Sequence, residues 1–455
     1  MKTIKYILAK FQNSLFFTYS ILSYLALMGV FFWIFSYAYP TLLQLTREAA
    51  VALVTYVLTG LFMLNAYGGM DLGQKRTRQI VYSMILVIFF ADLFTYILVQ
   101  VTNPSIWNIW QFGFFSIRRL VFTFVVQVLL IIALAWIGNR IYYRLNPPKR
   151  TFIIYGTKKK PNKLIQKVTK QAYTYKVTRV ASNQHKAQNL ENIQGHDLVI
   201  LYGLPKDERI AYSEYCYKHK VALLFSAEVM DVVEFRSKHT LIDDISLFST
   251  NIAEVSIEDR ILKRLLDILV SLVGLILTSP LWLVFAILIK LEDKGPVFFK
   301  QKRMTKNNRE FEIIKFRTMK VNVENRSATK NDDRITKIGN ILRKIRLDEL
   351  PQILNILKGD MSVVGPRPEM LENVNAYTEE MPEFALRLRV KAGLTGYAQI
   401  YGKYNTSPKD KLILDLMYIE NFNIFLDIKL ILQTVMVFLK IDDSTEGFDE
   451  EDDTQ

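Results

Sequence analysis

Two neighbouring carboxylates, Asp348 and Glu349, lie in the basic stretch KIRLDELPQ. The four histidines are at positions 185, 196, 219 and 239, and the one cysteine is at 216, so neither residue type occurs from 240 onward. The last part of the chain therefore cannot supply a histidine-dependent triad, a thiol nucleophile or a Cys/His zinc site. Any acid, base, nucleophile or metal ligand there must be Asp, Glu, Lys, Tyr, Ser or Thr.

The same part of the chain is rich in cations. They are Arg303, Lys315, Arg317, Arg334, Arg343, Arg346, Arg367 and Arg389. A cationic site that has only carboxylates for its chemistry is typical of phosphoryl transfer with Mg²⁺. We expect Arg343 and Arg346 to lower the pKa values of the two carboxylates. An ionised aspartate beside a bound phosphate can act as a nucleophile and form an aspartyl-phosphate ester.

A purely structural role for the two carboxylates is also possible. Leu350, Ile353, Ile356 and Leu357 have helical spacing, and Pro351 is tolerated only in a first turn, so we expect a helix to start near Asp348. Asp348 would then be an N-cap, and Glu349 would compensate the helix dipole. Because a helix N-terminus also attracts phosphate, both interpretations stay open at this point.

Four apolar stretches fill the first third of the chain, at about 15–38, 49–69, 80–101 and 119–138. Each has close to the ~20 residues that cross a bilayer as a helix. Lysines and arginines gather before the first stretch, between the second and third, and after the fourth. By the positive-inside rule, both ends of this four-helix transmembrane domain, residues 1–150, are expected in the cytoplasm.

After residue 150 the long apolar stretches give way to short apolar runs separated by polar segments, which predicts a second domain. The runs TFIIYG, LVILYG and VALLFS are short, apolar and rich in β-branched residues, which indicates a Rossmann-like α/β domain with a parallel sheet over about 151–245. The first strand ends in Gly156 but lacks the G-x-G-x-x-G spacing. We therefore favour a structural or regulatory role over a nucleotide site.

The fifth apolar stretch, KRLLDILVSLVGLILTSPLWLVFAILIKLEDKG, has basic residues on both flanks, unlike a simple crossing segment. Pro280 removes a backbone donor and kinks the helix, and Ser279 can hydrogen-bond a freed carbonyl. An ordinary kinked span and a re-entrant helix over 263–291, which returns to the same face, both fit these residues.

Composition narrows the partners. The net charge is +14, and the segment 441–455, which we expect to be a disordered tail, holds eight acidic residues and no basic one. The remaining excess of cations suits anionic membrane lipid or a phosphorylated substrate, while the 50% hydrophobic content argues against nucleic acid. A single cysteine permits no internal disulfide.

Residues 260 to 440 resemble the bacterial sugar transferase family, the polyprenyl-phosphate sugar-1-phosphate transferases. The motifs that carry the resemblance occur in the same order as in the family: KRLLDI, the Ser-Pro break, GPVFFKQKRMT, FEIIKFRTM, RLDELPQILNILKGDMSVVGPRPE and VKAGLTGYAQIYGK. The four apolar stretches and the α/β domain resemble the larger members that start capsule or exopolysaccharide synthesis. The resemblance implies a mostly α-helical, membrane-associated catalytic domain over 255–440.

The resemblance also implies a reaction in which a UDP-sugar gives its sugar-1-phosphate, with glucose as the preferred sugar over galactose, to undecaprenyl phosphate and UMP is released. Asp348 would be the nucleophile, and Glu349 would help to hold Mg²⁺ with it or activate the lipid phosphate. Gln352 would orient this dyad. The residues that the resemblance implies to bind phosphate are Arg303, Lys315, Arg317 and Arg367. We add Arg343 and Arg346 to the expected substrate-binding residues, because they lie close to the dyad in the sequence.

The substrate favours the re-entrant helix, because nucleotide sugars are cytoplasmic and a fifth crossing would place Asp348 outside. We therefore expect a multi-pass protein of the bacterial plasma membrane with a cytoplasmic catalytic domain. Its candidate protein partners are a second copy of the chain, in a homo-oligomer, and capsule-assembly proteins. The alternatives are a membrane glycosyltransferase that moves a sugar without its phosphate and a non-enzymatic scaffold of polysaccharide assembly.

Overall fold

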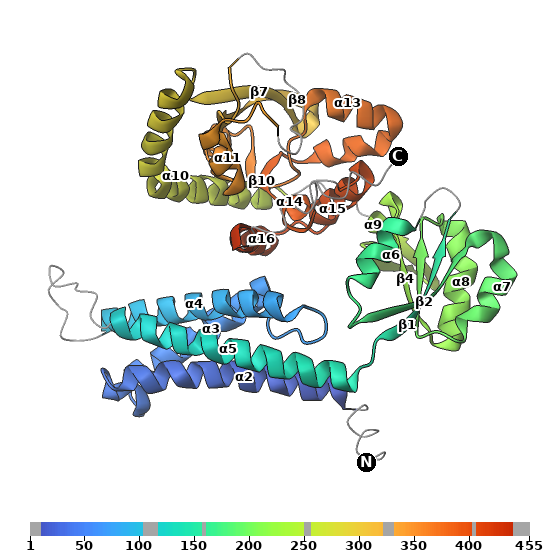
Figure 1. Ribbon diagram of the computed structural model, residues 1–455, viewed down its shortest axis with the longest axis horizontal. Coiled ribbons are helices and arrows are strands. Elements are labelled where there is room, and N and C mark those ends of the chain that lie inside the picture. Colours follow the sequence, from blue (N-terminus) through green and yellow to red (C-terminus); the bar gives the residue numbers. More distant parts are fainter. Residues whose placement is uncertain are drawn as a thin grey trace. The chain divides into compact units, whose positions relative to one another are not determined.

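A computed structural model describes residues 11–102, 117–156, 161–249, 256–321, 332–402 and 406–439, so the predicted acidic tail lies outside the described residues. The chain forms two compact units that divide between Ser226 and Ala227. Figure 1 shows their helices and strands in sequence colours. The first unit holds the four N-terminal apolar helices and an α/β sheet, and the second unit holds Asp348 and Glu349.

The four predicted apolar stretches are helices long and apolar enough to cross a membrane. They are α2 (Gln12–Ser36), α3 (Arg47–Tyr67), α4 (Thr77–Thr102) and α5 (Ile117–Leu145). A buried amide ties them together: Gln127 Nε2 on α5 donates to the Leu27 carbonyl on α2, at 3.0 Å, and to Asp92 Oδ1 on α4, at 3.2 Å. Such polar contacts hold helices together where apolar burial gives little drive, because lipid is as apolar as the helices.

The sheet of the first unit is parallel throughout, with the order β2-β1-β3-β4. Its elements are β1 (Lys149–Tyr155), α6 (Asn162–Thr169), β2 (Tyr175–Ser182), α7 (Lys186–Ile193), β3 (Leu198–Tyr202), α8 (Lys206–His219) and β4 (Ala222–Phe225). Alternate residues of β1 face opposite sides: Phe152 packs with Tyr212 of α8, and Ile153 packs with Val168 of α6. Helices thus cover both faces, and the edge strand β2 is an element that the three apolar runs did not predict.

The second unit contains the longest helix and several small sheets. Its elements are α9 (Val229–Glu234), β5 (Lys238–Ile242), β6 (Ile245–Ser249), α10 (Ile257–Asp293), β7 (Phe298–Thr305), β8 (Arg309–Phe316), α11 (Lys337–Lys344), α12 (Gln352–Lys358), β9 (Ser362–Val364), α13 (Leu371–Glu380), β10 (Gly393–Thr395), α14 (Tyr397–Tyr401), α15 (Pro408–Glu420) and α16 (Ile424–Leu439). β7 and β8 form an antiparallel hairpin, and β9 and β10 pair in parallel. α9 packs on α15, so the residues after Ser226 belong to this unit.

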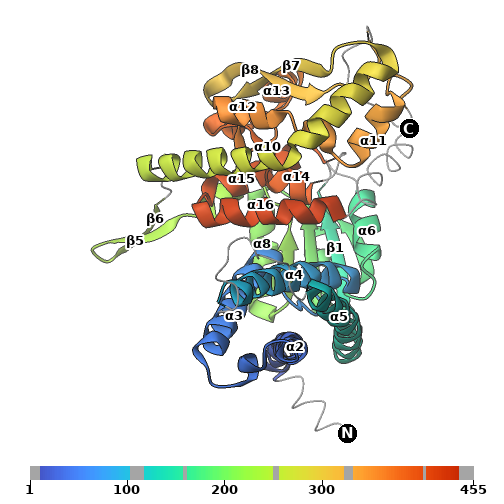
Figure 2. The ribbon, with the colours of Figure 1, turned by 90° about the vertical axis from the view of Figure 1, so that its left-hand side faces the viewer.

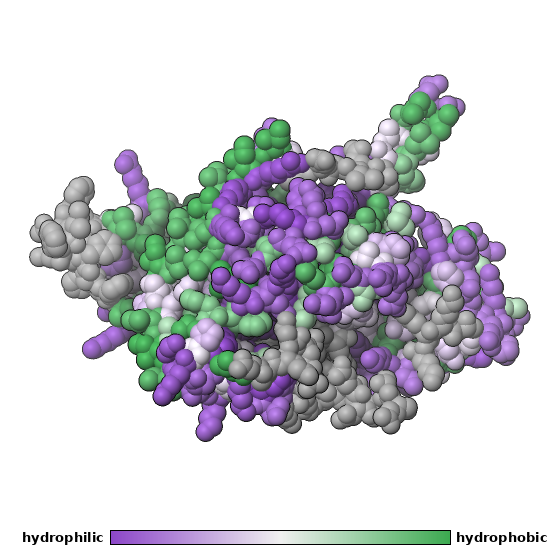
Figure 3. Space-filling view, turned by 90° about the horizontal axis from the view of Figure 1, so that it is seen from above, coloured by the Kyte–Doolittle hydropathy of each residue, from purple (hydrophilic) through white to green (hydrophobic). Residues whose placement is uncertain are grey.

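α10 is a single helix with a bend, which Figures 1 and 2 show from two sides. Pro280 has no N–H to give to the carbonyl of Ile276, one turn earlier, and the Ser279 hydroxyl donates to that carbonyl at 2.9 Å instead. The helix is apolar and few of its residues are fully buried, and Leu277 and Leu283 are among its exposed side chains. In Figure 3 apolar residues gather on the side where Figure 1 shows α10. An exposed apolar surface of this size suits lipid rather than water.

Candidate active site

Asp348 and Glu349 lie in an irregular turn between α11 and α12. Arg346, just after the end of α11, has φ 54° and ψ 24°, a left-handed conformation that is uncommon for a residue other than glycine. A single 3₁₀ turn, Leu347–Glu349, follows, and α12 begins at Gln352. The predicted helix start near Asp348 thus takes the form of this 3₁₀ turn, which follows the left-handed Arg346, and the regular α-helix begins at Gln352. Neither carboxylate acts as the N-cap of α12, where Pro351 stands.

The Glu349 carboxylate is held by two cations from different segments. Lys315 Nζ, near the end of β8, donates to Glu349 Oε1 at 2.9 Å. Arg367, in the loop after β9, donates through Nη2 to the same oxygen at 2.6 Å and through Nη1 to Oε2 at 3.4 Å. Burial alone would raise the pKa of Glu349, but Arg367 and Lys315 outweigh it and hold that pKa well below the usual value. Glu349 is therefore a fixed anion.

The Asp348 carboxylate has a different environment. Among the residues that the structure describes, it accepts no hydrogen bond and forms no ion pair. Burial, and then the neighbouring charge of Glu349, raise the pKa of Asp348 to about 6, although Lys315, Arg343 and Arg367 act in the opposite direction. The pKa of Asp348 is thus raised, against the sequence-based expectation, although Arg343 acts to lower it. The pKa of Glu349 is lowered, but chiefly by Arg367 and Lys315 rather than by the expected Arg343 and Arg346. A carboxylate with free lone pairs beside a fully paired one is the better placed of the two to attack an electrophile.

Glu349 of the dyad lines a small pocket of about 290 Å³, including its open mouth. Its lining comprises Arg303, Ile313, Lys315, Glu349, Gln352, Arg367, Pro368 and Glu369. Arg303 lies on β7 and donates to the carbonyl of Pro368 and to Gln301, while its Nε has no partner among the described residues. Burial lowers the pKa of Arg303 to about 10, with Arg367 adding to the effect. Buried cations that crowd one another stabilise a bound anion such as a diphosphate.

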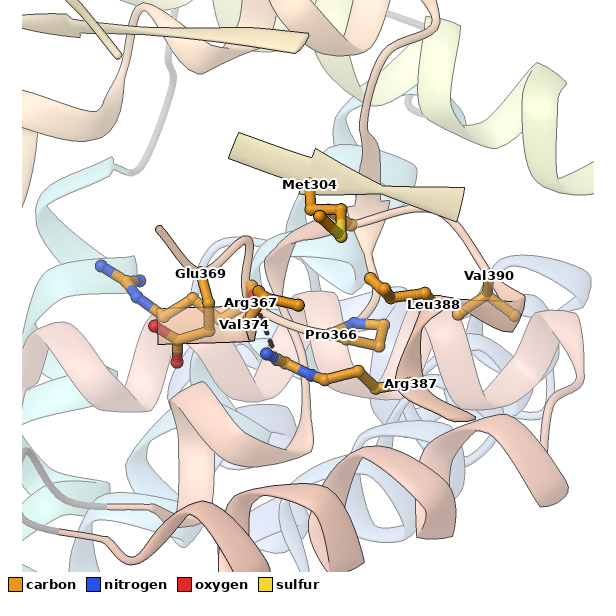
Figure 4. Close-up of a pocket in the computed structure, with 9 residues that line it drawn as sticks. Met304, Pro366, Arg367, Glu369, Val374, Arg387, Leu388 and Val390 are labelled. Carbon is orange, nitrogen blue, oxygen red and sulfur yellow. Dashed lines mark hydrogen bonds between the residues drawn. The ribbon is translucent and has the colours of Figure 1, made fainter. Parts of the chain in front are cut away.

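A second, adjoining pocket shares Arg367 and Glu369 with the first (Figure 4). In it, Arg387 Nη2 donates to the backbone carbonyl of Arg367 at 2.8 Å, and Arg387 also pairs with Asp415, both side chains being 2% exposed. Glu369 pairs with Lys411 at 3.2 Å. The predictions from sequence missed Glu369, although it ends the GPRPE motif from which Arg367 was chosen.

The structure brings six of the predicted residues to the dyad and separates one from it. Gln352 is buried in the pocket wall, and Arg346 acts electrostatically on both carboxylates. Arg343 donates to Thr318 Oγ1 at 2.8 Å and still acts on Asp348. Arg317 instead pairs with Asp293 at the end of α10. Its position therefore gives it a structural ion pair and no contact with the dyad.

The dyad offers a limited set of ligands for a metal ion. In the segments that the structure describes, no group of three or more His, Cys, Asp or Glu side chains could hold one. Asp348 presents a carboxylate that is not engaged by another described residue, whereas both oxygens of Glu349 already accept from cations. Two carboxylates fit Mg²⁺ provided that phosphate oxygens and water complete its shell, which is how Mg²⁺ is usually bound in phosphoryl transfer.

Comparison with known proteins adds to this geometry. The model of a family described as bacterial sugar transferase matches residues 258–441, which contain the dyad and its pocket. The chain is 43% identical over 184 residues to the UDP-N-acetylgalactosamine-undecaprenyl-phosphate N-acetylgalactosaminephosphotransferase of Aeromonas hydrophila, covering 39% of this chain and 44% of that protein.

Two further relatives match a comparable share of the chain. The UDP-glucose:undecaprenyl-phosphate glucose-1-phosphate transferase of Escherichia coli K12 is 37% identical over 221 residues, 46% of this chain and 47% of that protein. The exopolysaccharide production protein PSS of Rhizobium leguminosarum is 42% identical over 190 residues, 39% of this chain and 95% of that protein. The match thus spans about half the length of the larger relatives and nearly the whole of a small one.

Proposed function

Because this chain belongs to the bacterial sugar transferase family, we propose that it transfers a sugar-1-phosphate from a UDP-sugar to undecaprenyl phosphate and releases UMP. The observation that carries the proposal is the asymmetry of the dyad: Asp348 is free to react, and Glu349 is fixed by Lys315 and Arg367. Glucose-1-phosphate is our first candidate for the transferred group, since several relatives are named as glucose-1-phosphate transferases, and N-acetylgalactosamine-1-phosphate is the second.

The reaction proceeds in two displacements at one phosphorus. An Asp348 carboxylate oxygen attacks the phosphorus that bears the sugar, forms an aspartyl-phosphate bond and breaks the bond to the bridging oxygen, which leaves on UMP. A phosphate oxygen of undecaprenyl phosphate then attacks the same phosphorus and breaks the aspartyl bond. The products are undecaprenyl-diphosphate sugar and a regenerated Asp348.

The cations of the pocket bind and orient the anionic donor in this scheme. Arg303 and Arg367 face a site that must accept the charge of a diphosphate, and Lys315 fixes Glu349 beside the attacking carboxylate. Glu349, held ionised, orients the acceptor phosphate or a metal ion in the second displacement. Asp348 and Glu349 would hold Mg²⁺ together with phosphate oxygens, and the ion when bound offsets the repulsion between donor phosphates and carboxylate.

α10 enters the membrane and returns to the same face in this proposal. Its bend at Pro280, its bare apolar surface and the cations on both flanks support that arrangement. The four preceding helices return the chain to the cytoplasm, where nucleotide sugars are found. Asp348 then lies at the cytoplasmic membrane surface, within reach of a lipid phosphate.

The direct test incubates the full chain in lipid nanodiscs with undecaprenyl phosphate and labelled UDP-glucose, UDP-galactose or UDP-N-acetylgalactosamine. We expect label in the lipid and release of UMP with one of them. Release of UDP would instead indicate a glycosyltransferase. No transfer from any donor would favour a scaffold.

A further inference from the structure

We propose that α10, besides anchoring the protein, sets the geometry of the turn that carries Asp348 and Glu349. It acts as a template through two arms, the part of the helix before Pro280 and the part after it. Arg264 on its first arm and Glu292 on its second are then positioning residues. The chain runs from α11 through the dyad into α12, and each arm holds one of these two helices. The proposal rests on the proposed function only in that the positioned residues are the catalytic pair.

The first arm, before Pro280, holds α12. Arg264 donates from Nη1 to the carbonyl of Ile356 and from Nη2 to that of Leu357, both at 2.6 Å. These are carbonyls of the last turn of α12, which a cationic donor stabilises through both hydrogen bonds and the helix dipole. A Cβ at Gly274 would lie 3.4 Å from Ile353, so the arm and α12 also pack closely.

The same arm is anchored to the rest of the unit by its neighbouring charges. Asp267, 3% exposed, accepts from Ser362 Oγ at 2.9 Å and from the backbone N–H of Val363 at 2.8 Å. Lys263 donates to Asp427 of α16 at 2.6 Å and to the carbonyl of Val364 at 3.0 Å. β9, which these contacts hold, leads directly into the loop of Arg367. The first arm therefore supports both α12 and the cation that fixes Glu349.

The second arm, after Pro280, holds α11 and the dyad turn itself. Glu292 accepts from the backbone N–H groups of Lys337 at 2.7 Å and Ile338 at 3.3 Å, the first two residues of α11. Trp282, Phe285 and Ile289 pack in one apolar cluster with Phe316 and Leu342. That cluster also contains Leu347 and Leu350, the two residues that flank the dyad.

A change in the angle between the arms would move α11 and α12 apart or together, and the only chain between them is the dyad turn. Arg346 in the left-handed conformation already makes that turn a strained connection. Catalysis that depends on near-attack geometry is sensitive to displacements of about 1 Å, which can cost ~10²-fold in rate. The membrane-inserted helix is thereby coupled to the chemistry.

The test compares Arg264→Ala and Glu292→Ala in the full chain in nanodiscs, with Lys358→Ala as the matched control. Lys358 is on α12, 77% exposed, and pairs only with Asp360 among the described residues. Its substitution therefore removes a cation at the same helix end and leaves the hydrogen bonds of Arg264 in place. Glu292→Gln, which keeps one acceptor, is the conservative variant. Glu292 is exposed, so we expect its variants to fold. They therefore still test the proposal if Arg264→Ala does not fold.

Two readouts separate positioning from general stability. We expect amide hydrogen exchange to accelerate in residues 345–352 in both alanine variants, with the thermal unfolding midpoint unchanged, and kcat to fall about 10-fold or more with KM for the UDP-sugar changed less than about threefold. Glu292→Gln should recover part of kcat, and Lys358→Ala should match the unsubstituted protein. Unchanged exchange and kcat in both alanine variants would overturn the template. Absence of transfer in the unsubstituted protein would sink the proposed reaction instead, while the exchange readout would still decide on the template.

Discussion

Arg367 and Glu349 face each other across 2.6 Å, and this ion pair, with Lys315 on the same carboxylate oxygen, makes two adjacent carboxylates chemically different. Glu349 is fixed as an anion, and Asp348 keeps its oxygens free and a pKa that is raised to about 6. Proximity alone would leave the two residues interchangeable. Because only Glu349 of the two is paired with other described residues, the proposed reaction assigns the role of nucleophile to Asp348 and that of an oriented charge to Glu349.

Substitution of Glu349 tests that division of roles. In Glu349→Gln, the side chain keeps its shape but loses the charge that Arg367 and Lys315 neutralise. We expect lipid-linked product to fall by about 100-fold or more, in the range of a lost general base or oriented charge. The phosphosugar adduct on the protein should still form. Loss of the adduct together with the product would show that Glu349 is needed already in the first displacement.

The pH dependence follows from the state of Asp348. The nucleophile must be ionised, and its pKa is raised to about 6, so kcat/KM should fall as pH drops through about 6 and level off above it. Lys315 lowers this pKa, so Lys315→Met should move the acidic limb to higher pH. Lys302→Met is the control, because Lys302 lies on the neighbouring strand β7 and forms an exposed ion pair with Glu310. This variant should leave the acidic limb in place. If the acidic limb stays at the same pH in Lys315→Met, the limb does not report the ionisation of Asp348.

Removal of divalent cations should stop turnover. A diphosphate donor brings two to three negative charges to an anionic nucleophile, and a divalent ion offsets that repulsion. We expect excess chelator to abolish transfer from UDP-sugar and Mg²⁺ to restore it. Full activity with chelator present would mean that Arg303, Lys315 and Arg367 suffice.

Topology is tested at the hairpin between β7 and β8, where Asn308 lies in the turn. With Cys216 replaced, a cysteine at Asn308 should react only with reagents that reach the cytoplasm. Pro280→Leu restores the missing N–H and permits a straight helix over residues 265–289, which at ~1.5 Å per residue is roughly 37 Å long, enough for a ~30 Å core. A fraction of that variant should then be labelled from outside. Outside labelling of the unsubstituted protein at this position would exclude the re-entrant arrangement.

The sequence predicted the apolar helices, the break in α10 and the dyad with most of its cations, because each depends on local pattern or on motif. Arg317 shows what local pattern misses. Alternation along a strand would put Lys315 and Arg317 on one face, but β8 ends at Phe316 and Arg317 turns to Asp293. The pairing of Glu369 with Lys411 likewise joins segments that are distant in the sequence, which no local spacing encodes.

The covalent adduct on Asp348 tests the central proposal most directly. The full chain in nanodiscs, with Mg²⁺ and a UDP-sugar donor but no undecaprenyl phosphate, is digested and its peptides are analysed by mass spectrometry. We predict a sugar-phosphate on the peptide that contains Asp348, about one UMP released per protein molecule, and neither in Asp348→Asn, with the adduct lost when undecaprenyl phosphate is added. UMP release that requires the lipid acceptor, with no adduct at any stage, or an adduct that persists in Asp348→Asn, would contradict it.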